Sequence, residues 1–425
     1  MNKVAKVAMA GAVAMVLGTL SGALWPGVAA TAVAADAPAS GKPQVSAAAG
    51  KDLIAAQKDM KEQKWDDMLV ELDKVKANPK KNEYDEFLMN EFYVTAYFNK
   101  KQLQQVTGPL EATIASKYSS PEDVKKRVVV AAGLYYELKN YDKAIEYANR
   151  AMKDGYGTDK LQLIAAQSYY LKNDFKDANR AIQGMVSDEI KAGQVPTEEN
   201  LKLGLSAASK INDDAASTHW LELLVTYHPN AEYWQNLLDG LYRGKPTDKQ
   251  LLQVYRLSLD VGAIKRGSDY AEMAQMALDA GSPGEAVATL NKAFADNVFT
   301  ATADKNRYEH LLNSAKKQAA ADQATLAKTE AEAADAPNGD RLIGTGIGYF
   351  GYGNYAKAIK DISAGLAKGT GKSDPEDARL LLGIAQFKSG DKDSAIKTFK
   401  SVKGDPTLQR IAGLWVLHVK ATATA

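Results

Sequence analysis

The sequence contains no cysteine in its 425 residues. No disulfide can form, and thiolate zinc sites, cysteine nucleophiles and a lipidated cysteine at an export cleavage site are all excluded. Histidine is scarce as well. The four histidines are His219, His228, His310 and His418. None has a second ligand at metal-binding spacing on one helix face, so we expect no metal site and a fold that depends on packing for its stability.

The sequence also lacks an excess of charge of either sign. Its 53 basic and 52 acidic side chains give a formal net charge of +1. Proteins that bind nucleic acids concentrate lysine and arginine on one surface. The densest basic run, residues 125–127, directly follows Glu122 and Asp123, which is typical of a solvated helix start. We therefore expect no nucleic-acid partner.

Sequence motifs of catalysis are missing too. There is no G-x-S-x-G, P-loop or H-E-x-x-H pattern. Gly346, Gly348 and Gly351 match G-x-G-x-x-G, but this pattern indicates a dinucleotide site only between a strand and a helix, and the flanks here are helical. Five glycines within residues 344–353 leave two interpretations open, a close helix crossing or a hinge. We predict no catalytic and no cofactor-binding residue.

The first residues differ in kind from the rest. Lys3 and Lys6 precede an apolar run from Val7 to Trp25, and residues 32–34 read Ala-Val-Ala. A basic start, an apolar stretch and an A-x-A site are the three parts of a secretory signal peptide. We predict a cleaved signal peptide at 1–34, a flexible leader at 35–48 and export to the periplasm. The alternative is an uncleaved membrane anchor, because the run is almost long enough to span a bilayer.

The rest of the chain has apolar residues at helical spacing and contains an internal repeat. Val129–Met152 and Leu163–Val186 align without a gap at an offset of 34 residues. Each segment has an Ala-Ala pair, a Tyr-Tyr pair, a polar turn and then a small residue, Ala144 or Ala178. Here the chain resembles the tetratricopeptide repeat family, whose unit is a helix–turn–helix of this length.

The same register continues through most of the chain. The small or apolar anchors of the second helices are Met68, Val106, Ala144, Ala178, Ala216, Leu251, Ala286, Ala324, Ala358 and Ala395. The resemblance implies an all-α fold, a right-handed α-solenoid of about ten hairpins and about 21 helices. We assign residues 49–405 to this solenoid and residues 406–425 to a capping helix and tail that cover its last apolar face.

In the family, the first helix of each hairpin lines a concave face that holds peptides or partner helices. One position on that face carries aromatic side chains throughout the chain: Phe98, Tyr136, Tyr170, Tyr242, Phe350 and Phe387. Aromatic residues supply contact area at low entropic cost, so they suit an interface. The alternative is that they only pack between repeats.

The last two hairpins carry an apolar stripe at the inward positions. It consists of Ile343, Ile347, Phe350, Leu380, Ile384 and Phe387. Because this face is normally open to solvent, we predict that residues 340–390 form the main partner-binding surface, for an apolar peptide, a partner helix or a second copy of the chain. The alternative is that winding of the chain buries these residues.

These observations favour a binding protein without enzymatic activity. The resemblance implies a periplasmic scaffold or adaptor for protein or peptide partners of a cell-envelope machine. One alternative is an inner-membrane-anchored accessory subunit of a secretion, polysaccharide-export or energy-coupling complex. A less favoured one is an enzyme with a site in the solenoid groove. Membrane contact is expected only through partners or an uncleaved signal segment.

Overall fold

The computed structural model of the protein describes residues 43–424, and within this range every regular element is a helix. There are twenty α-helices and no strand in the described residues, so the predicted all-α class is confirmed. The predicted signal peptide and residues 35–42 of the predicted leader lie outside this range. No helix within it combines the length and the apolar character needed to cross a membrane.

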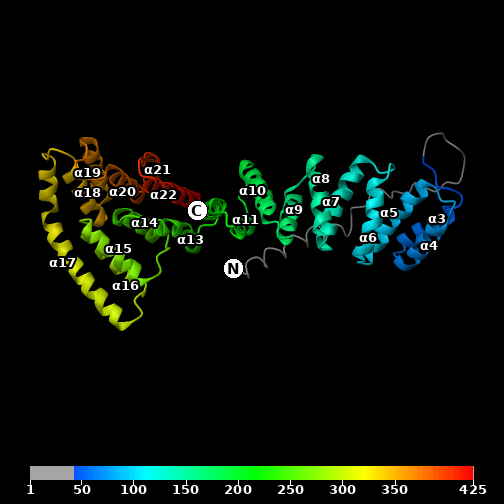
Figure 1. Ribbon diagram of the computed structural model, residues 1–425, viewed down its shortest axis with the longest axis horizontal. Coiled ribbons are helices and arrows are strands. Elements are labelled where there is room, and N and C mark those ends of the chain that lie inside the picture. Colours follow the sequence, from blue (N-terminus) through cyan, green and yellow to red (C-terminus); the bar gives the residue numbers. More distant parts are fainter. Residues whose placement is uncertain (1–42, 425) are drawn as a thin grey trace. The chain divides into compact units, whose positions relative to one another are not determined.

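The chain divides into two compact units, which meet between Ser217 and Thr218. The N-terminal unit is a row of helical hairpins (Figure 1), in which each second helix also contacts the first helix of the next hairpin. Its helices are α3 (Gly50–Lys61), α4 (Trp65–Ala77), α5 (Glu83–Asn99), α6 (Leu103–Ala115), α7 (Pro121–Glu137), α8 (Tyr141–Lys153), α9 (Asp159–Leu171), α10 (Phe175–Lys191) and α11 (Glu198–Lys210). Helix α12 (Asp214–Tyr227) crosses the boundary.

The C-terminal unit has a different internal arrangement. Its helices are α13 (Ala231–Arg243), α14 (Asp248–Asp260), α15 (Gly267–Asp279), α16 (Pro283–Ala295), α17 (Thr302–Ala333), α18 (Asp340–Gly351), α19 (Tyr355–Lys368), α20 (Pro375–Lys388), α21 (Lys392–Lys400) and α22 (Pro406–Thr424). Helices α20 and α22 lie against α14, and α18 lies against α16 (Figure 1). The last helices of this unit therefore pack back on its first ones.

Eight hairpin turns share one backbone design. Each has a residue with positive φ just after the first helix: Gln63, Lys101, Lys139, Asn173, Asn212, Gly281, Gly353 and Gly390. In the α7–α8 turn, the next residue, Asn140, donates its backbone N–H to the Tyr135 carbonyl at 2.8 Å, which closes a Schellman motif. The Asn140 side chain then accepts the backbone N–H of Lys143 and caps α8. One residue thus ends one helix and starts the next.

Most of the predicted anchors occupy the helix crossings. Seven of the ten have no exposed surface: Met68, Val106, Ala144, Ala178, Ala286, Ala358 and Ala395. Ala216 and Leu251 are half-buried, whereas Ala324 is exposed. A small residue at these crossings lets two helices approach closely, so the repeat register is correct wherever the anchor is buried.

The prediction of an eighth hairpin, anchored at Ala324, is wrong. Residues 302–333 form the single helix α17, of 32 residues. The sequence has no glycine, proline or asparagine between Asn313 and Pro337, so nothing there favours a turn. The described residues accordingly contain twenty helices, with one long helix where this hairpin is expected.

The glycine-rich segment of α18 is a packing site and not a hinge. A Cβ on Gly346 would lie 2.5 Å from Ile362 Cγ1 of α19, and one on Gly351 would lie 2.5 Å from Ser282 Oγ beside α16. A Cβ on Gly348 would lie 3.0 Å from Leu326 of α17. The helix is continuous through all three positions. The G-x-G-x-x-G spacing therefore brings three neighbouring helices close to α18.

Candidate functional site

The C-terminal unit contains a cavity of about 600 Å³, which we call the acidic cavity. Side chains from α14, α15, α18 and the start of α20 line it. The apolar ones include Leu252, Met276, Ile343, Ile347 and Leu381, and the carboxylates are Asp248, Glu272, Asp279, Asp374 and Asp377. Lys249 and Arg256 are its basic residues. The cavity therefore combines apolar surface with an excess of negative charge.

A pair of polar side chains joins α14 to α20 inside the acidic cavity. Gln253 is only 1% exposed, and its Nε2 donates to Asp377 Oδ1 at 2.7 Å. The Gln253 Oε1 is buried and accepts no hydrogen bond from the described residues. Burial raises the pKa of Asp377, and the hydrogen bond from Gln253 and the charge of Arg256 offset that only in part. A donor entering the cavity would satisfy an acceptor that now has no partner.

Arg256 forms the wall between this cavity and a second one. Its Nε and Nη2 donate to Glu285 Oε1 and Oε2 at 2.8 and 2.7 Å, and its guanidinium lies 5.4 Å from the ring centre of Phe350. Both ionic side chains are almost fully buried. A bidentate pair of this kind satisfies both charges, so Arg256 is already committed within the fold.

The second cavity, of about 770 Å³, is the Trp415 cavity. Phe350, Ile384 and Trp415 supply apolar surface, and Lys292 and Lys388 supply positive charge. The Nε1 of Trp415 is buried and has no hydrogen-bond acceptor among the described residues. The carboxylates Asp260 and Glu285 also line this cavity, so its charges are more nearly balanced than those of the acidic cavity, with which it shares Arg256.

An ionic contact closes the C-terminal unit beside the Trp415 cavity. Asp260 of α14 pairs with Lys388 of α20 and accepts a hydrogen bond at 2.8 Å from Nε2 of His418 of α22. Burial alone would raise the pKa of Asp260, but the hydrogen bonds from His418 and Lys388 lower it overall. The His418 ring also meets the edges of Trp234 and Trp415. Helix α14 is thereby joined to α20 and α22 by residues 128 and 158 positions away in sequence.

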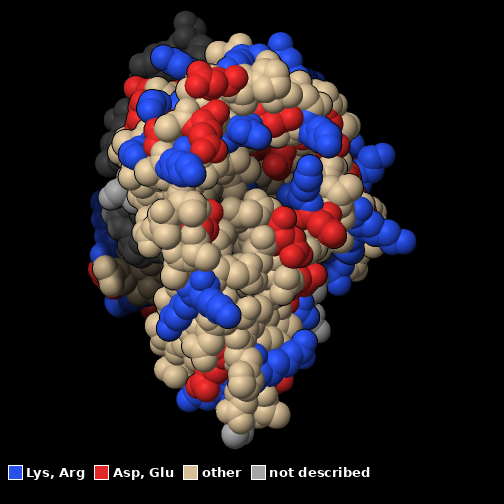
Figure 2. Space-filling view, turned by 90° about the vertical axis from the view of Figure 1, so that its left-hand side faces the viewer, with Lys and Arg blue, Asp and Glu red and all other residues tan. Residues whose placement is uncertain are grey.

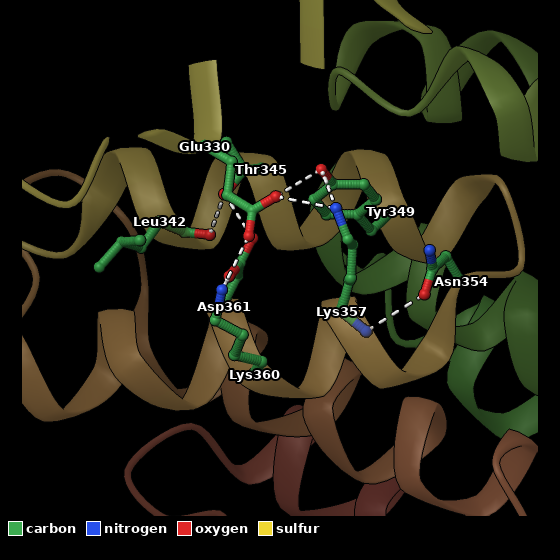
Figure 3. Close-up of polar contacts among 8 residues, drawn as sticks. All are labelled: Glu330, Leu342, Thr345, Tyr349, Asn354, Lys357, Lys360 and Asp361. Carbon is green, nitrogen blue, oxygen red and sulfur yellow. Dashed lines mark hydrogen bonds and ion pairs between the residues drawn. The ribbon is translucent and has the colours of Figure 1, made fainter. Parts of the chain in front are cut away.

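A second polar cluster attaches α17 to α18 and α19 (Figure 3). The Glu330 carboxylate accepts hydrogen bonds from Tyr349 Oη at 2.5 Å, Lys357 Nζ at 3.1 Å and Lys360 Nζ at 2.8 Å. The hydrogen bonds from Lys360 and Tyr349 lower the pKa of Glu330 to about 2. Glu330 is therefore a stable carboxylate at neutral pH.

Neither lysine of this cluster, Lys357 or Lys360, is set up as a nucleophile. The hydrogen bonds of Lys357 to Tyr349 and Glu330 raise its pKa. The hydrogen bond of Lys360 to Glu330 raises the pKa of that lysine as well, whereas a nucleophilic amine needs a lowered one. Nearby, the buried Asp361 accepts a hydrogen bond from Thr345 at 3.0 Å, and burial raises its pKa (Figure 3). The cluster is suited to helix attachment. Across the described residues, no three histidine, aspartate or glutamate side chains are grouped to hold a metal ion.

The surface at the α17–α19 end carries charge of both signs. Figure 2 shows lysine and arginine interspersed with aspartate and glutamate, with uncharged surface between them. No field of a single sign covers this face.

A comparison with known protein families gives a match near the C-terminal end of the chain. A family model of the tetratricopeptide repeat matches residues 377–405, which cover most of α20 and all of α21. The hairpin, the anchor Ala395 and the turn glycine Gly390 all lie in this match. This end of the chain thus contains a tetratricopeptide repeat. A comparison with curated proteins gave no match.

Several solved structures of helical-repeat proteins resemble the chain loosely. The TPR2AB domain of yeast Sti1, in a complex with pHSP90, is 14% identical; the match covers 72% of this chain and 100% of that one, with a TM-score of 0.24. The maize pentatricopeptide repeat protein PPR10 is 11% identical, with 88% and 62% covered and a TM-score of 0.29. The tetratricopeptide domain of P58(IPK) is 13% identical, with 88% and 99% covered and a TM-score of 0.22. At such scores these superpositions carry no argument about function.

Within the repeats, the predicted aromatic residues lie beside the hairpin turns. Tyr136 meets the ring of Tyr141 at 6.0 Å and Tyr170 that of Phe175 at 5.1 Å, each across its own turn. Phe98 packs against the hydrophobic core of the N-terminal unit. Tyr242 is the most exposed of the predicted set, at 36%, and its hydroxyl lies 2.9 Å from Ser258 Oγ. These contacts show a packing role, and a binding role stays a prediction.

The predicted apolar stripe is not open to solvent as expected. Ile343, Leu380 and Ile384 are 2%, 0% and 1% exposed, and Ile347, Phe350 and Phe387 are half-buried. The reason is the contact of α18 with α16 and of α20 with α14 and α22. The structure divides the stripe: Ile343 and Ile347 line the acidic cavity, whereas Phe350 and Ile384 line the Trp415 cavity. Phe387 meets the Trp415 ring instead.

Sequence reasoning missed the polar residues of both cavities. Gln253 and Arg256 stand three residues apart on α14, and with Ser258 they are the polar residues among its buried positions, which is a weak signal of a polar interior. Their partners, Asp377 and Glu285, lie 124 and 29 residues away. No local pattern could have indicated the pair with Asp377.

Proposed function

We propose that this tetratricopeptide-repeat protein is an exported scaffold that binds protein or peptide partners of the cell envelope. The repeat fold supports the scaffold role, because proteins built from stacked helical hairpins commonly present surfaces for other chains. The signal-like segment at residues 1–34 supports export. The most concrete support for binding comes from the C-terminal unit.

One observation carries the binding proposal. The acidic cavity is lined by apolar side chains of α14, α15, α18 and α20, and by Gln253, whose buried Oε1 has no hydrogen-bond partner in the described residues. Its volume of about 600 Å³ lies within the roughly 300–1,000 Å³ of typical ligand clefts. A binding function accounts for both features. The titratable clusters at Arg256 and Glu330 engage their own neighbours, which favours binding over catalysis.

The binding proposal is tested by photo-crosslinking in intact cells. A photoreactive amino acid replaces Met276, which lines the acidic cavity, or Val195, which is exposed on the N-terminal unit. Mass spectrometry then identifies the attached chain and the crosslinked peptide. We expect one protein to be attached repeatedly at position 276 and not at 195. Equal labelling at both positions would contradict the proposal.

The export proposal has its own test. The intact mass of the protein recovered from the envelope fraction distinguishes the cleaved form, which has lost residues 1–34, from the full chain. We expect the cleaved form. A full-length mass together with recovery in the membrane fraction would favour the membrane-anchored accessory subunit, for which the apolar run from Val7 to Trp25 is the only observation.

A further inference from the structure

We propose that the acidic cavity holds a lysine or arginine side chain of a partner segment together with an apolar side chain next to it. This inference rests on the proposed binding function and specifies the chemistry of the partner. Three features of the cavity carry it: its unpaired carboxylates, its unpartnered polar side chain and its apolar lining.

The carboxylates of the cavity outnumber the cations that could neutralise them. Asp248, Asp279 and Asp374 are exposed at its rim, and Asp377 is half-buried. None of the four is in an ion pair with another described residue. Arg256 is engaged by Glu285, which leaves Lys249 as the cation of the cavity without an ion pair in the described residues. A positively charged occupant would complement this charge.

The loop that carries the rim carboxylate Asp374 is also held in place without help from a ligand. Asp374 lies in the loop between α19 and α20. Backbone N–H groups of Gly371, Lys372 and Ser373 in this loop donate to the Asp340 carboxylate at 2.8–3.1 Å. These hydrogen bonds lower the pKa of Asp340 to about 2. The loop is thus fixed to the start of α18, and an incoming side chain would not have to order it.

The side chain of Gln253 indicates a ligand independently of the charge of the cavity. Its Nε2 donates to the Asp377 carboxylate, and its buried Oε1 has no hydrogen-bond partner in the described residues, although Gln253 lines the cavity. A buried acceptor without a hydrogen bond is costly, and native structures contain few of them. An ammonium or guanidinium group carries several donors. One such group could donate to Gln253 Oε1 and to Asp377 together.

The apolar lining argues for a protein segment as the source of the charge. Ile343, Ile347 and Leu381 face the same cavity as the carboxylates. A small inorganic cation would leave the accessible parts of Ile347 and Met276 in contact with water, whereas a lysine stem and a neighbouring apolar side chain would cover them. The volume admits a few side chains and not a whole helix. The expected partner motif is therefore a basic residue beside an apolar one in an extended or loosely folded segment.

The test uses the full chain and fluorescence anisotropy with capped, labelled peptides. The probe peptide is Gly-Ser-Leu-Lys-Leu-Ser-Gly, and the comparison peptides carry glutamate or norleucine in place of the lysine. We expect the lysine peptide to bind at least about 10-fold more tightly than either, as a charge-assisted hydrogen bond implies. Asp377→Asn should weaken it by about 10-fold. Asp248→Asn with Asp279→Asn should weaken it and reduce its salt dependence.

A matched control removes two exposed carboxylates of the same unit from outside the cavity. Asp335→Asn with Asp393→Asn should leave the affinity unchanged. If circular dichroism shows that Asp377→Asn does not fold, the affinity of the double variant Asp248→Asn with Asp279→Asn decides the test.

Equal binding of the lysine and norleucine peptides, with crosslinking at position 276 intact, would overturn this inference and leave the proposed function standing. Absence of both peptide binding and crosslinking would overturn both. Butylammonium should not displace the labelled lysine peptide when both are present at similar concentrations. If it does, the cavity binds small amines and the proposed docking of a protein segment is overturned.

Discussion

At the scale of single residues, the repeat depends on turn residues that serve two helices at once. Asn140, Asp174 and Asn354 each close the Schellman motif of one helix with their backbone N–H. Each also caps the next helix with its side chain. The corresponding residues Lys64 and Gln102 make the backbone contact without a side-chain cap. The stabilisation from the side-chain cap can therefore be measured separately from that of the backbone hydrogen bond.

Asn140→Ala should lower the free energy of unfolding by about 1 kcal/mol, because α8 loses the side-chain acceptor at its start. Urea unfolding followed by the helical signal measures the change. Gln102→Ala removes a side chain at the equivalent position that makes no cap, and it should have a much smaller effect. Equal losses for the two variants would mean that the Asn140 cap does not stabilise the helix.

A glycine series in one hairpin separates backbone from packing effects. Gly353 has a φ of 71°, and no heavy atom lies within 4 Å of the position that a Cβ would take, so Gly353→Ala should destabilise through the backbone alone, by about 1–2 kcal/mol. Gly344 lies inside α18 with open space around it, so Gly344→Ala should stabilise by up to about 1 kcal/mol. Gly346→Ala should destabilise, because its Cβ would press on Ile362. Thermal unfolding of the three variants measures the signs, and a uniform sign would refute this account.

The residue scale is also where the sequence was most informative. Ala144 and Ala178 could be recognised as crossing residues because the repeat copies lie 34 residues apart, and both are fully buried. Turn residues and anchors act over a few positions, so their pattern is visible in the chain. Gln253 could not be recognised in this way, because the reason for a buried amide is a carboxylate 124 residues away.

At the scale of elements, α17 is the departure from the repeat. A hairpin was predicted there from register alone, yet the segment lacks turn residues and is rich in alanine, which favours one long helix. Most of α17 is exposed, and Leu326 and Glu330 provide contacts with α18 and α19. Register predicts where a turn fits, but turn chemistry decides whether it forms.

The Glu330 contact should make the docking of α17 depend on pH. The pKa of Glu330 is about 2 in the fold against 4.5 for an ordinary glutamate, so its contribution is fully present above about pH 4.5 and is lost as the pH falls toward 2. Because Lys357 and Lys360 are largely exposed, we expect Glu330→Gln to cost only about 1 kcal/mol at pH 7. The difference from wild type should vanish near pH 2.

Glu332→Gln is the matched control for this variant. Glu332 is exposed on the same helix, and its ammonium partner Lys328 is 3.9 Å away. Denaturant unfolding at several pH values should show almost no effect at any of them. A loss at Glu330 that does not depend on pH would indicate a packing defect and not an electrostatic contact.

At the scale of the whole molecule, the two units differ in how their contacts are distributed along the chain. The N-terminal unit joins hairpins that are neighbours in sequence. In the C-terminal unit, Asp260 reaches Lys388 and His418, at separations of 128 and 158 residues. The prediction that the apolar stripe is open to solvent is wrong for this reason. Its spacing indicates an open face, but helices from distant parts of the chain cover it.

Asp260→Asn should affect the C-terminal unit alone. It leaves Lys388 and His418 without their carboxylate, and because Lys388 is exposed and Asp260 only partly buried, we expect a loss of about 1–3 kcal/mol, below that of a fully buried pair. Trp220, Trp234 and Trp415 are fully buried in the C-terminal unit, so tryptophan fluorescence reports mainly on that unit. We expect its unfolding midpoint to fall while a second transition in the helical signal stays in place. Leu110→Ala in the N-terminal unit should do the reverse. A single transition shifted by both variants would contradict the division into two units.

The return of the last helices onto α14 has a consequence for how the protein is made. Contacts between neighbouring hairpins can form as soon as each hairpin has been synthesised, which favours rapid, stepwise folding. The pairs of Gln253 with Asp377, Gln250 with Asp405 and Glu222 with Arg410 span 124, 155 and 188 residues. The interior of the C-terminal unit must therefore wait for the end of the chain, and until α22 arrives its apolar surfaces are open to chaperones, proteases and other nascent chains.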